Sequence, residues 1–182
     1  RLIFNHIAEI VGDGYDPCDI DPVRYKNHEF ENIRVRKLDL CTDAQLLPKN
    51  HYDLILHNHV MEHIPCNYTA VLCHLHHSLA EEGMHIFSIP VIGIKYGESF
   101  ADLTLEERKQ RYGQSDHMRN FAREDLERTI GMIFDIKEQM TTNTPDKLFE
   151  KDLLYKHNIP PSRWRKFNGA TPLILKKGDL LI

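Results

Sequence analysis

The sequence predicts an α/β protein with a doubly wound, mainly parallel sheet and helices on both of its faces. Two compact apolar runs, YDLILHN (52–58) and MHIFSIPVI (84–92), are typical of buried parallel strands. Between them, residues 66–80 place apolar side chains on one face at helical spacing. Strands that alternate with helices in this way indicate a parallel sheet whose faces are covered.

Further strands are expected on both sides of this unit. YDPCDI (15–20) follows a Gly-Asp-Gly turn, and IRVRKLDL (33–40) alternates and is rich in β-branched residues. TPLILKK (171–177) predicts another strand, and MIFDIKEQM (132–140) is a plausible sixth. The length of 182 residues fits one domain, residues 1–182, that can bury most of its apolar surface.

The expected helices have local boundary signals. Pro65 suits the start of the helix within residues 66–80, and Gly83 suits its exit. REDLERTIG (123–131) predicts a second helix that ends at Gly131. LIFNHIAEIV (2–11) is apolar at helical spacing, with a short strand as the alternative.

Two polar stretches interrupt the pattern of strands and helices. Residues 94–120 are expected to form an insertion over the site, and residues 141–170 a long excursion before the last strand. Neither stretch contains a repeat or a low-complexity segment, so neither predicts a second domain.

The composition excludes several classes of function. Hydrophobic residues make up 41% of the chain and charged residues 27%, as in ordinary globular proteins. The net charge of −4 gives no general attraction for nucleic acid or anionic lipid. No apolar stretch approaches the roughly 20 residues that cross a bilayer, and no secretory signal is visible. The four cysteines form no C-x-x-C pair, which indicates buried thiols in a reducing compartment and predicts a cytoplasmic protein.

The segment HNHVMEHIP (57–65) is rich in histidine and first suggests a metal site. Histidines two apart on a strand point the same way, and a third histidine could close a zinc site. The segment is one residue longer than the His-x-His-x-Asp-His motif of metallo-β-lactamase-like hydrolases, and Met61 and Glu62 stand where that motif has one Asp. We therefore assign no metal, and a metal-dependent hydrolase using His57, His59 and His63 remains a third alternative.

The ends of the expected strands favour a nucleoside cofactor instead. In open α/β sheets, ligands bind outside the carboxyl ends of the strands. One strand ends at Asp19, whose carboxylate can accept hydrogen bonds from both hydroxyls of a ribose. The next ends at Asp39 and Leu40, which suit the amine and the ring of adenine, and the third ends at His57-Asn58-His59.

These segments resemble the class I S-adenosylmethionine (SAM)-dependent methyltransferases. YDLILHNHVMEHIP is similar to the family's "fDLI…HVLEHI" segment, and SLAEEGMHIFSIP is similar to "vLkpGG.l..svP". YGQSDHMRNF (112–121) resembles the "fGQ.DHvR.y" segment of a bacterial subgroup. The segments follow the family's order over residues 15–140, with support at 171–177, and the resemblance implies a Rossmann-like fold.

The resemblance also implies a set of cofactor residues. SAM would be the methyl donor and S-adenosylhomocysteine the product. Asp19, with Ile20 beside it, would bind the ribose hydroxyls, while Asp39 would bind the adenine amine and Leu40 would pack on its ring. At the end of the central strand, the pocket would be lined by Asn58 and His59. A turn or helix-capping role is the alternative for the two aspartates.

The family's glycine-rich loop has no clear counterpart. The Gly12-Asp13-Gly14 sequence lies only five residues before Asp19, which leaves no room for the helix that separates the loop from the acidic residue. Either residues before Arg1 supply the loop, or LIFNHIAE is a shortened version without glycine. The first strand of the sheet is accordingly expected to be short or absent.

The catalytic residues are expected in the GQSDHMR segment. Histidine is the commonest general base near neutral pH, so His117 is the first candidate and His63 the second. Asp116 is expected to orient the base and Arg119 to hold an anionic or hydroxylated acceptor, with a structural pairing of these two residues as the alternative.

The expected function is methyl transfer to an oxygen or nitrogen of a small-molecule or sugar-type acceptor. A non-catalytic binding or scaffold module with the same fold is the main alternative. No nucleic-acid or membrane partner is expected, and the sequence leaves monomer and homodimer open.

Overall fold

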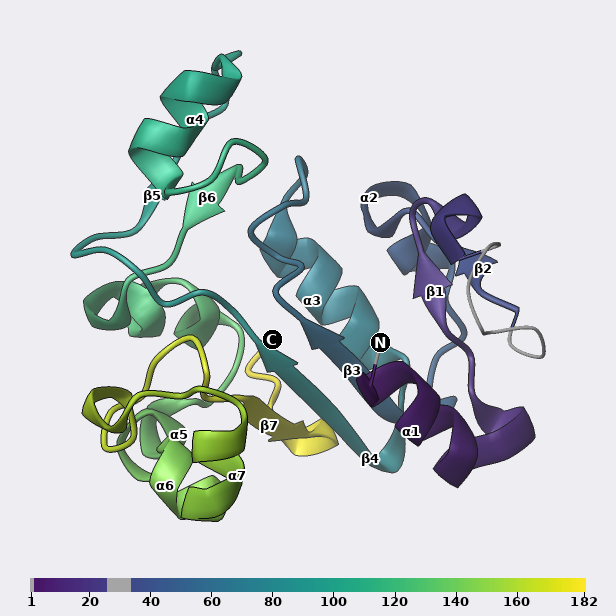
Figure 1. Cartoon of the computed structure of the whole chain (residues 1–182). Helices are drawn as coiled ribbons and strands as arrows, with labels where there is room; N and C mark the ends of the chain where they lie inside the picture. The colour runs from purple at the N-terminus through teal and green to yellow at the C-terminus, as the bar shows by residue number, and fades with distance from the viewer. Residues whose placement is uncertain (1, 26–33) are drawn as a thin grey trace. The chain divides into compact units, whose positions relative to one another are not determined.

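The computed structural model describes residues 2–25 and 34–182, with side chains from residue 7 onward. The chain folds into two compact units, Arg1–Leu46 and Leu47–Ile182 (Figure 1). The mixed α/β character and the parallel strand pairs predicted from the sequence are confirmed within these units. The single domain over residues 1–182 stays a prediction.

The first unit is built around two short parallel strands, β1 (Cys18–Asp19) and β2 (Arg36–Lys37). Both are much shorter than the predicted strands at 15–20 and 33–40, and Ile33 lies outside the described residues. Helices and turns make up most of the rest of this unit: α1 (Leu2–Val11), η1 (Gly12–Gly14), η2 (Pro22–Tyr25), α2 (Leu40–Asp43) and η3 (Ala44–Leu46).

The segment 2–11 is therefore a helix, not a strand. The Gly-Asp-Gly sequence after it forms a 3-10 turn that leads toward β1, as expected for a turn entering a strand. Gly12 has φ +62°, a left-handed conformation that glycine adopts without steric cost. This glycine ends the helix and reverses the chain.

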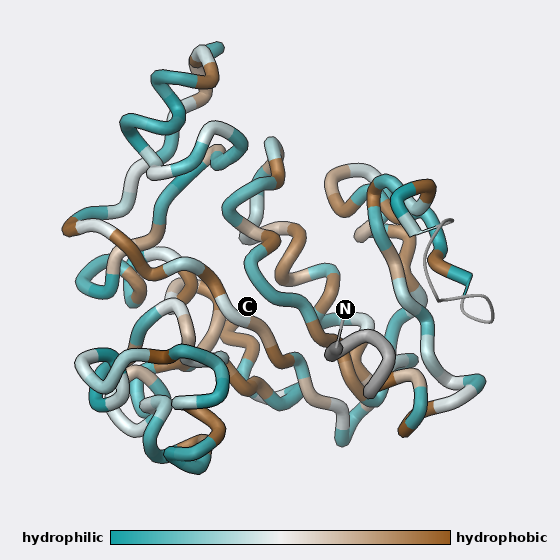
Figure 2. Tube along the Cα trace, in the orientation of Figure 1, coloured by the Kyte–Doolittle hydropathy of each residue, from teal (hydrophilic) through white to brown (hydrophobic). Residues whose placement is uncertain are grey.

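The second unit contains a three-stranded sheet in the order β3-β4-β7. The strands β3 (Tyr52–Asn58) and β4 (Leu79–Ser88) are parallel, and α3 (Tyr68–His77) connects them as predicted. The last strand, β7 (Leu173–Lys176), pairs antiparallel with β4. Figure 2 shows apolar residues along the strands of this sheet.

The boundaries of α3 and β4 differ from the predicted ones. The helix is capped by Asn67, whose side-chain oxygen accepts hydrogen bonds from the backbone of Thr69 and Ala70. Gly83 lies inside β4 and does not end the helix. A Cβ atom on Gly83 would lie 2.8 Å from the carbonyl oxygen of Tyr52, so this glycine allows the close approach of β3.

The sixth strand predicted at 132–140 is wrong. Residues there form η5 (Ile130–Met132), a single bridge at Phe134 and the helix α5 (Lys137–Thr142). The predicted helix at 123–131 is also irregular, since η4 (Arg123–Arg128) is a 3-10 helix. Ile133, Phe134 and Ile136 are all buried, so their burial follows tertiary packing and not the alternation of a strand.

The two polar stretches fold as follows. Residues 94–120 contain the antiparallel pair β5 (Gly97–Glu98) and β6 (Arg119–Asn120) with α4 (Leu105–Tyr112) between them. Residues 141–170 contain three short helical segments, and a last turn follows β7: α6 (Pro145–Leu148), α7 (Lys151–Lys156), η6 (Pro161–Arg163) and η7 (Lys177–Asp179).

The core of the second unit lies where α3 and the segments after β6 pack on the sheet. The most deeply buried apolar side chains include Met61, Leu72, Leu79, Phe87, Phe121, Leu126, Ile130, Phe134, Leu173 and Leu175.

Among the described residues, no helix combines the length and the apolar character that a membrane span requires.

Two histidine rings meet in the same sheet, His85 fully buried and His57 half-buried. The Nε2 atoms of His57 and His85 lie 2.9 Å apart, and the ring of His57 stacks on Phe87. Both Nδ1 atoms are buried without a hydrogen-bond partner among the described residues. Burial lowers the pKa of His57 to about 3 and holds that of His85 well below its usual value.

We expect the free energy of unfolding to fall as the pH drops below 6.5, the ordinary pKa of histidine. The folded-state pKa values of His57 and His85 are depressed, so below pH 6.5 the unfolded chain binds protons that the folded chain does not. The stability that depends on these two neutral histidines is fully present above pH 6.5. As the pH falls below that value, the free energy of unfolding drops by about 1.4 kcal/mol per pH unit for each histidine. Urea unfolding measured from neutral to mildly acidic pH checks this slope.

The double variant H57L/H85L removes both titrating groups and both orphaned nitrogens. We expect it to unfold with a much shallower pH dependence, whereas His77→Leu, at an exposed position on α3, leaves the slope unchanged. A double variant that keeps the wild-type slope would show that other groups cause the acid sensitivity.

Candidate functional site

The two aspartates of the first unit lie at one edge of its strand pair. Cys18 pairs with Arg36 and Asp19 with Lys37, so the carboxyl ends of the parallel strands meet. Asp19 is the last residue of β1, and Asp39 follows β2 by two residues. The sequence analysis expected both carboxylates at such an edge, and within this unit they are there.

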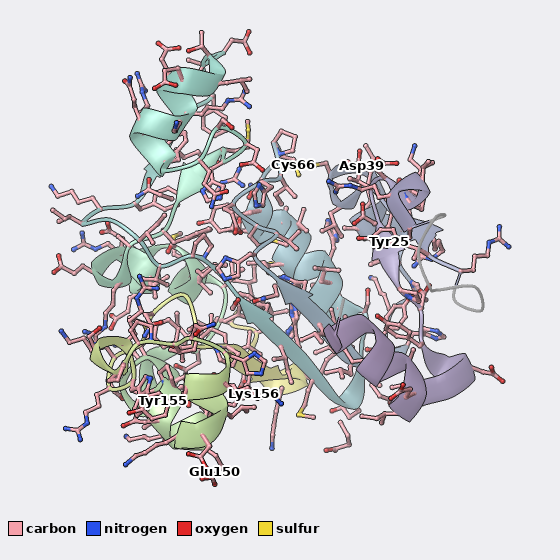
Figure 3. All side chains as sticks on the ribbon, in the orientation of Figure 1. Tyr25, Asp39, Cys66, Glu150, Tyr155 and Lys156 are labelled. Atoms are coloured by element: carbon pink, nitrogen blue, oxygen red, sulfur yellow. The ribbon has the colours of Figure 1, made fainter. Side chains whose placement is uncertain are left out.

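Asp19 is held by local hydrogen bonds. Its Oδ1 atom accepts from the backbone N–H of Asp21 at 2.8 Å, and its Oδ2 atom accepts from the hydroxyl of Tyr25 at 2.8 Å. Figure 3 labels Tyr25 and Asp39 among the side chains of this unit. Ile20, directly after it, is 59% exposed. The carboxylate is therefore fixed in place beside an exposed apolar side chain.

Asp39 caps the helix α2. Its Oδ1 atom accepts from the backbone N–H of Cys41 at 2.9 Å, and its own N–H donates to the carboxylate of Asp43. Leu40 begins the helix and is half-buried. Local capping explains why an aspartate stands here, and the other carboxylate oxygen can also accept a hydrogen bond.

Asn58 and His59 lie at the carboxyl end of β3. The side-chain oxygen of Asn58 accepts from the hydroxyl of Ser88 on the neighbouring strand. His59 has φ +52°, and its ring lies between Glu62 and the carbonyl of Gly169, at 3.2 Å from each. The hydrogen bond with Glu62 raises the pKa of His59.

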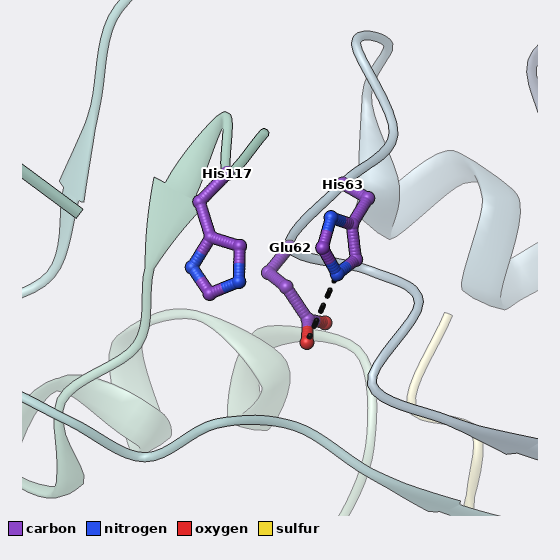
Figure 4. A group of neighbouring side chains, drawn as sticks. All are labelled: Glu62, His63 and His117. Carbon is purple, nitrogen blue, oxygen red and sulfur yellow. Dashed lines mark ion pairs between the residues drawn. The ribbon is translucent and has the colours of Figure 1, made fainter. Parts of the chain in front are cut away.

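Glu62, His63 and His117 form a cluster that we call the Glu62 cluster. One nitrogen or oxygen atom from each residue lies within 4.8 Å of the others. Figure 4 shows the side chain of Glu62 between the two rings. One backbone hydrogen bond joins the turn after β3 to the segment that leads into β6: the N–H of Met118 donates to the carbonyl of Glu62 at 2.8 Å. His63 and His117 were expected at the site from the sequence, whereas Glu62 was given no role there.

His117 is buried and its ring has a defined orientation. Its Nδ1 atom lies 3.1 Å from the backbone carbonyl of Tyr112, which can only accept a hydrogen bond. Nδ1 therefore carries the proton, and Nε2 keeps its lone pair in the neutral ring. Gly113, with φ +87°, ends α4 and turns the chain toward this histidine.

His63 is the partly exposed member of the cluster, with 36% of its side chain accessible. Its Nε2 atom lies 3.8 Å from Glu62, and its Nδ1 atom lies 3.3 Å from the carboxylate of Asp116. Asp116 is itself 67% exposed. The structure thus pairs Asp116 with His63 and not with His117 or Arg119, which were the partners considered from the sequence.

Arg119 has a different setting from the one expected at an acceptor site. Its side chain is only 1% exposed, and its guanidinium pairs with Glu98 at 2.7 Å. The same group donates to three backbone carbonyls in the turn after β3 and stacks over the ring of Tyr68. The three acceptors are the carbonyl oxygens of Met61, Ile64 and Cys66. Arg119 therefore fixes the turn that carries Glu62 and His63.

The histidine-rich segment divides between two environments. His57 lies against the buried His85, while His59 and His63 both contact Glu62. The three histidines proposed for a hydrolase site are therefore not brought together. The buried carboxylate of Glu62 was missed because a glutamate in a turn is normally exposed, and the sequence contains no signal for its burial.

Open α/β proteins bind nucleotide-like ligands at the carboxyl ends of their strands, where this chain has carboxylates and polar side chains. The family model of a methyltransferase domain matches residues 5–130, well over half of the chain. The chain therefore belongs to this family of methyltransferase domains. The match includes all ten residues expected at the site.

The solved structure of a SAM-dependent methyltransferase from Archaeoglobus fulgidus is similar to this chain with a TM-score of 0.48 and 15% sequence identity. The alignment covers 94% of this chain and 79% of that one. No curated protein matches the sequence.

Proposed function

We propose that the protein transfers the methyl group of SAM to an oxygen or nitrogen of a small-molecule or sugar-type acceptor, with His117 as the general base. The orientation of His117 is the observation that carries this proposal. Its Nδ1–H is held by the carbonyl of Tyr112, so Nε2 is available to take a proton. His63, whose ring lies edge-on to His117 at 4.8 Å, is the second candidate.

The chemistry requires alignment and one proton transfer. The acceptor atom attacks the methyl carbon in line with the carbon–sulfur bond, whose electron pair returns to sulfur and releases S-adenosylhomocysteine. The acceptor's proton moves to Nε2 of His117. Most of the rate enhancement would come from holding the two reactants in line, with the base contributing when the acceptor is a hydroxyl.

Each unit carries proposed cofactor contacts of its own. In the first unit, Asp19, with Ile20 beside it, would accept from the ribose hydroxyls and Asp39 from the adenine amine, and their shared edge supports this assignment. Leu40 would pack on the adenine ring. In the second unit, Asn58 and His59 at the end of β3 would contact the cofactor.

The acceptor would be held by Asp116, whose exposed carboxylate can accept hydrogen bonds from hydroxyl groups. Arg119 was expected to share this role, but its burial and its carbonyl partners support a positioning role instead. The Asp116→Asn variant should raise KM for a hydroxylated acceptor and leave the affinity for SAM unchanged.

The test of this function is the fate of a radiolabelled methyl group. The chain is incubated with labelled SAM and, separately, with small hydroxylated and amino compounds, with protein and with RNA. We expect label in the small-molecule fraction and release of S-adenosylhomocysteine. Label in protein or RNA, with none in any small acceptor, would contradict the proposed acceptor class.

A further inference from the structure

We propose that the Glu62 cluster binds a divalent transition-metal ion through the carboxylate of Glu62 and the Nε2 atoms of His63 and His117. This site goes beyond methyl transfer, and nothing in the family assignment requires it. The three residues come from two segments, the turn after β3 and the segment that leads into β6, which the fold brings together.

The donor set is the first argument. Two imidazole nitrogens and one carboxylate oxygen lie within 4.8 Å of one another, close enough to meet around one ion after small side-chain rotations. This combination is typical of zinc and iron sites, whereas magnesium and calcium prefer oxygen ligands alone. The chemistry of the donors therefore selects a transition metal.

The unsatisfied carboxylate is the second, independent argument. Glu62 is only 1% exposed, and its Oε2 atom is buried with no hydrogen-bond partner among the described residues. Its Oε1 atom faces His59 and His63. A buried carboxylate oxygen without a partner is costly, and a bound cation beside it would remove that cost.

The partners on the far side of each ring are the third argument. Histidines that bind metals commonly donate the other ring N–H to a carbonyl or a carboxylate, which fixes the ring and its tautomer. His117 has this arrangement through Nδ1 and the carbonyl of Tyr112, and His63 has it through Nδ1 and Asp116. Both Nε2 atoms are thereby left for the ion.

The site would have one open side. Glu62 and His117 are buried, but His63 is 36% exposed and Asp116 is 67% exposed. Three protein ligands leave a fourth position for water or for an oxygen of a substrate, as in catalytic zinc sites. A bound metal would take the lone pair of His117 Nε2, which the same atom needs to act as the general base. Metal binding and the base role are therefore alternatives for Nε2.

The test is a zinc titration of the untagged full chain, and it requires no methyl transfer. The protein is freed of metal with a chelator and titrated with zinc against a chromophoric competitor. We expect one zinc ion per chain and a loss of affinity of more than about tenfold in Glu62→Gln, His63→Gln and His117→Gln. Asp116→Asn should weaken binding by about tenfold, because it removes the partner of His63.

Matched controls separate this site from the exposed histidines of α3. His74→Gln and His77→Gln should bind zinc as the wild type does, since both residues are exposed on the helix. Cobalt absorption of the wild-type chain gives a readout that does not depend on the folding of any variant. The intense bands of a four- or five-coordinate ion are expected, and the weak bands of a six-coordinate ion would overturn the proposal. Absence of stoichiometric zinc binding, or equal losses in the control variants, would overturn it too.

Discussion

Replacing Arg119 by methionine is expected to lower the free energy of unfolding by about 3–5 kcal/mol, the usual cost of breaking a buried ion pair by removing one partner. The arginine is 1% exposed and pairs with Glu98, which would be left without its cation. The carbonyls of Ile64 and Cys66 would also lose a charged donor. Urea unfolding at neutral pH measures the change.

Two further variants isolate the cause. Arg123→Met removes an exposed arginine four residues away, and we expect it to change stability by no more than about 0.5 kcal/mol. Arg119→Lys keeps the charge but cannot donate to several carbonyls at once, so it should be intermediate. If Arg119→Met is as stable as Arg123→Met, the arginine does not fix the turn after β3.

Replacing His117 by alanine is expected to lower kcat by about 10²–10⁴-fold, the usual contribution of a general base. The residue lies in the second unit and is not among the proposed cofactor residues, so the affinity for SAM should stay unchanged. Steady-state methyl transfer gives kcat, and calorimetry gives the affinity. Imidazole added to the His117→Ala enzyme should restore part of the rate, because it can accept the proton in place of the side chain.

His77→Ala is the matched control, since it removes an exposed histidine of α3. Its kcat should equal that of the wild type. A His117→Ala enzyme with full activity would remove the base assignment and leave His63 as the remaining candidate.

The sequence predicted the fold best for the elements with a compact apolar run or a clear helical spacing, although β3 contains no fully buried residue. The strands at 52–58 and 171–177 and the helix between 66 and 80 were found close to their observed bounds. The strand predicted at 132–140 was wrong because its buried residues pack by tertiary contacts, which a sequence period does not reveal. Gly83 was taken for a helix end because the close approach of Tyr52 is visible only in three dimensions.

The candidate site shows the same limit. His63 and His117 could be named from the order of motifs along the chain, and the structure places them beside each other. The burial of Glu62 and Arg119 could not be named, because charged residues are normally exposed and only the fold shows what surrounds them. The carbonyl of Tyr112 also carries no sequence signal, although it determines which nitrogen of His117 is free.

A calorimetric titration of the whole chain with SAM and with S-adenosylhomocysteine tests the central claim most directly. We expect one site per chain with a dissociation constant in the micromolar range for both ligands. Asp19→Asn and Asp39→Asn should each weaken that binding, because each removes the charge that would accept from the nucleoside. A chain that gives no binding heat with either ligand, over a temperature range that excludes a cancelling enthalpy, would contradict the account.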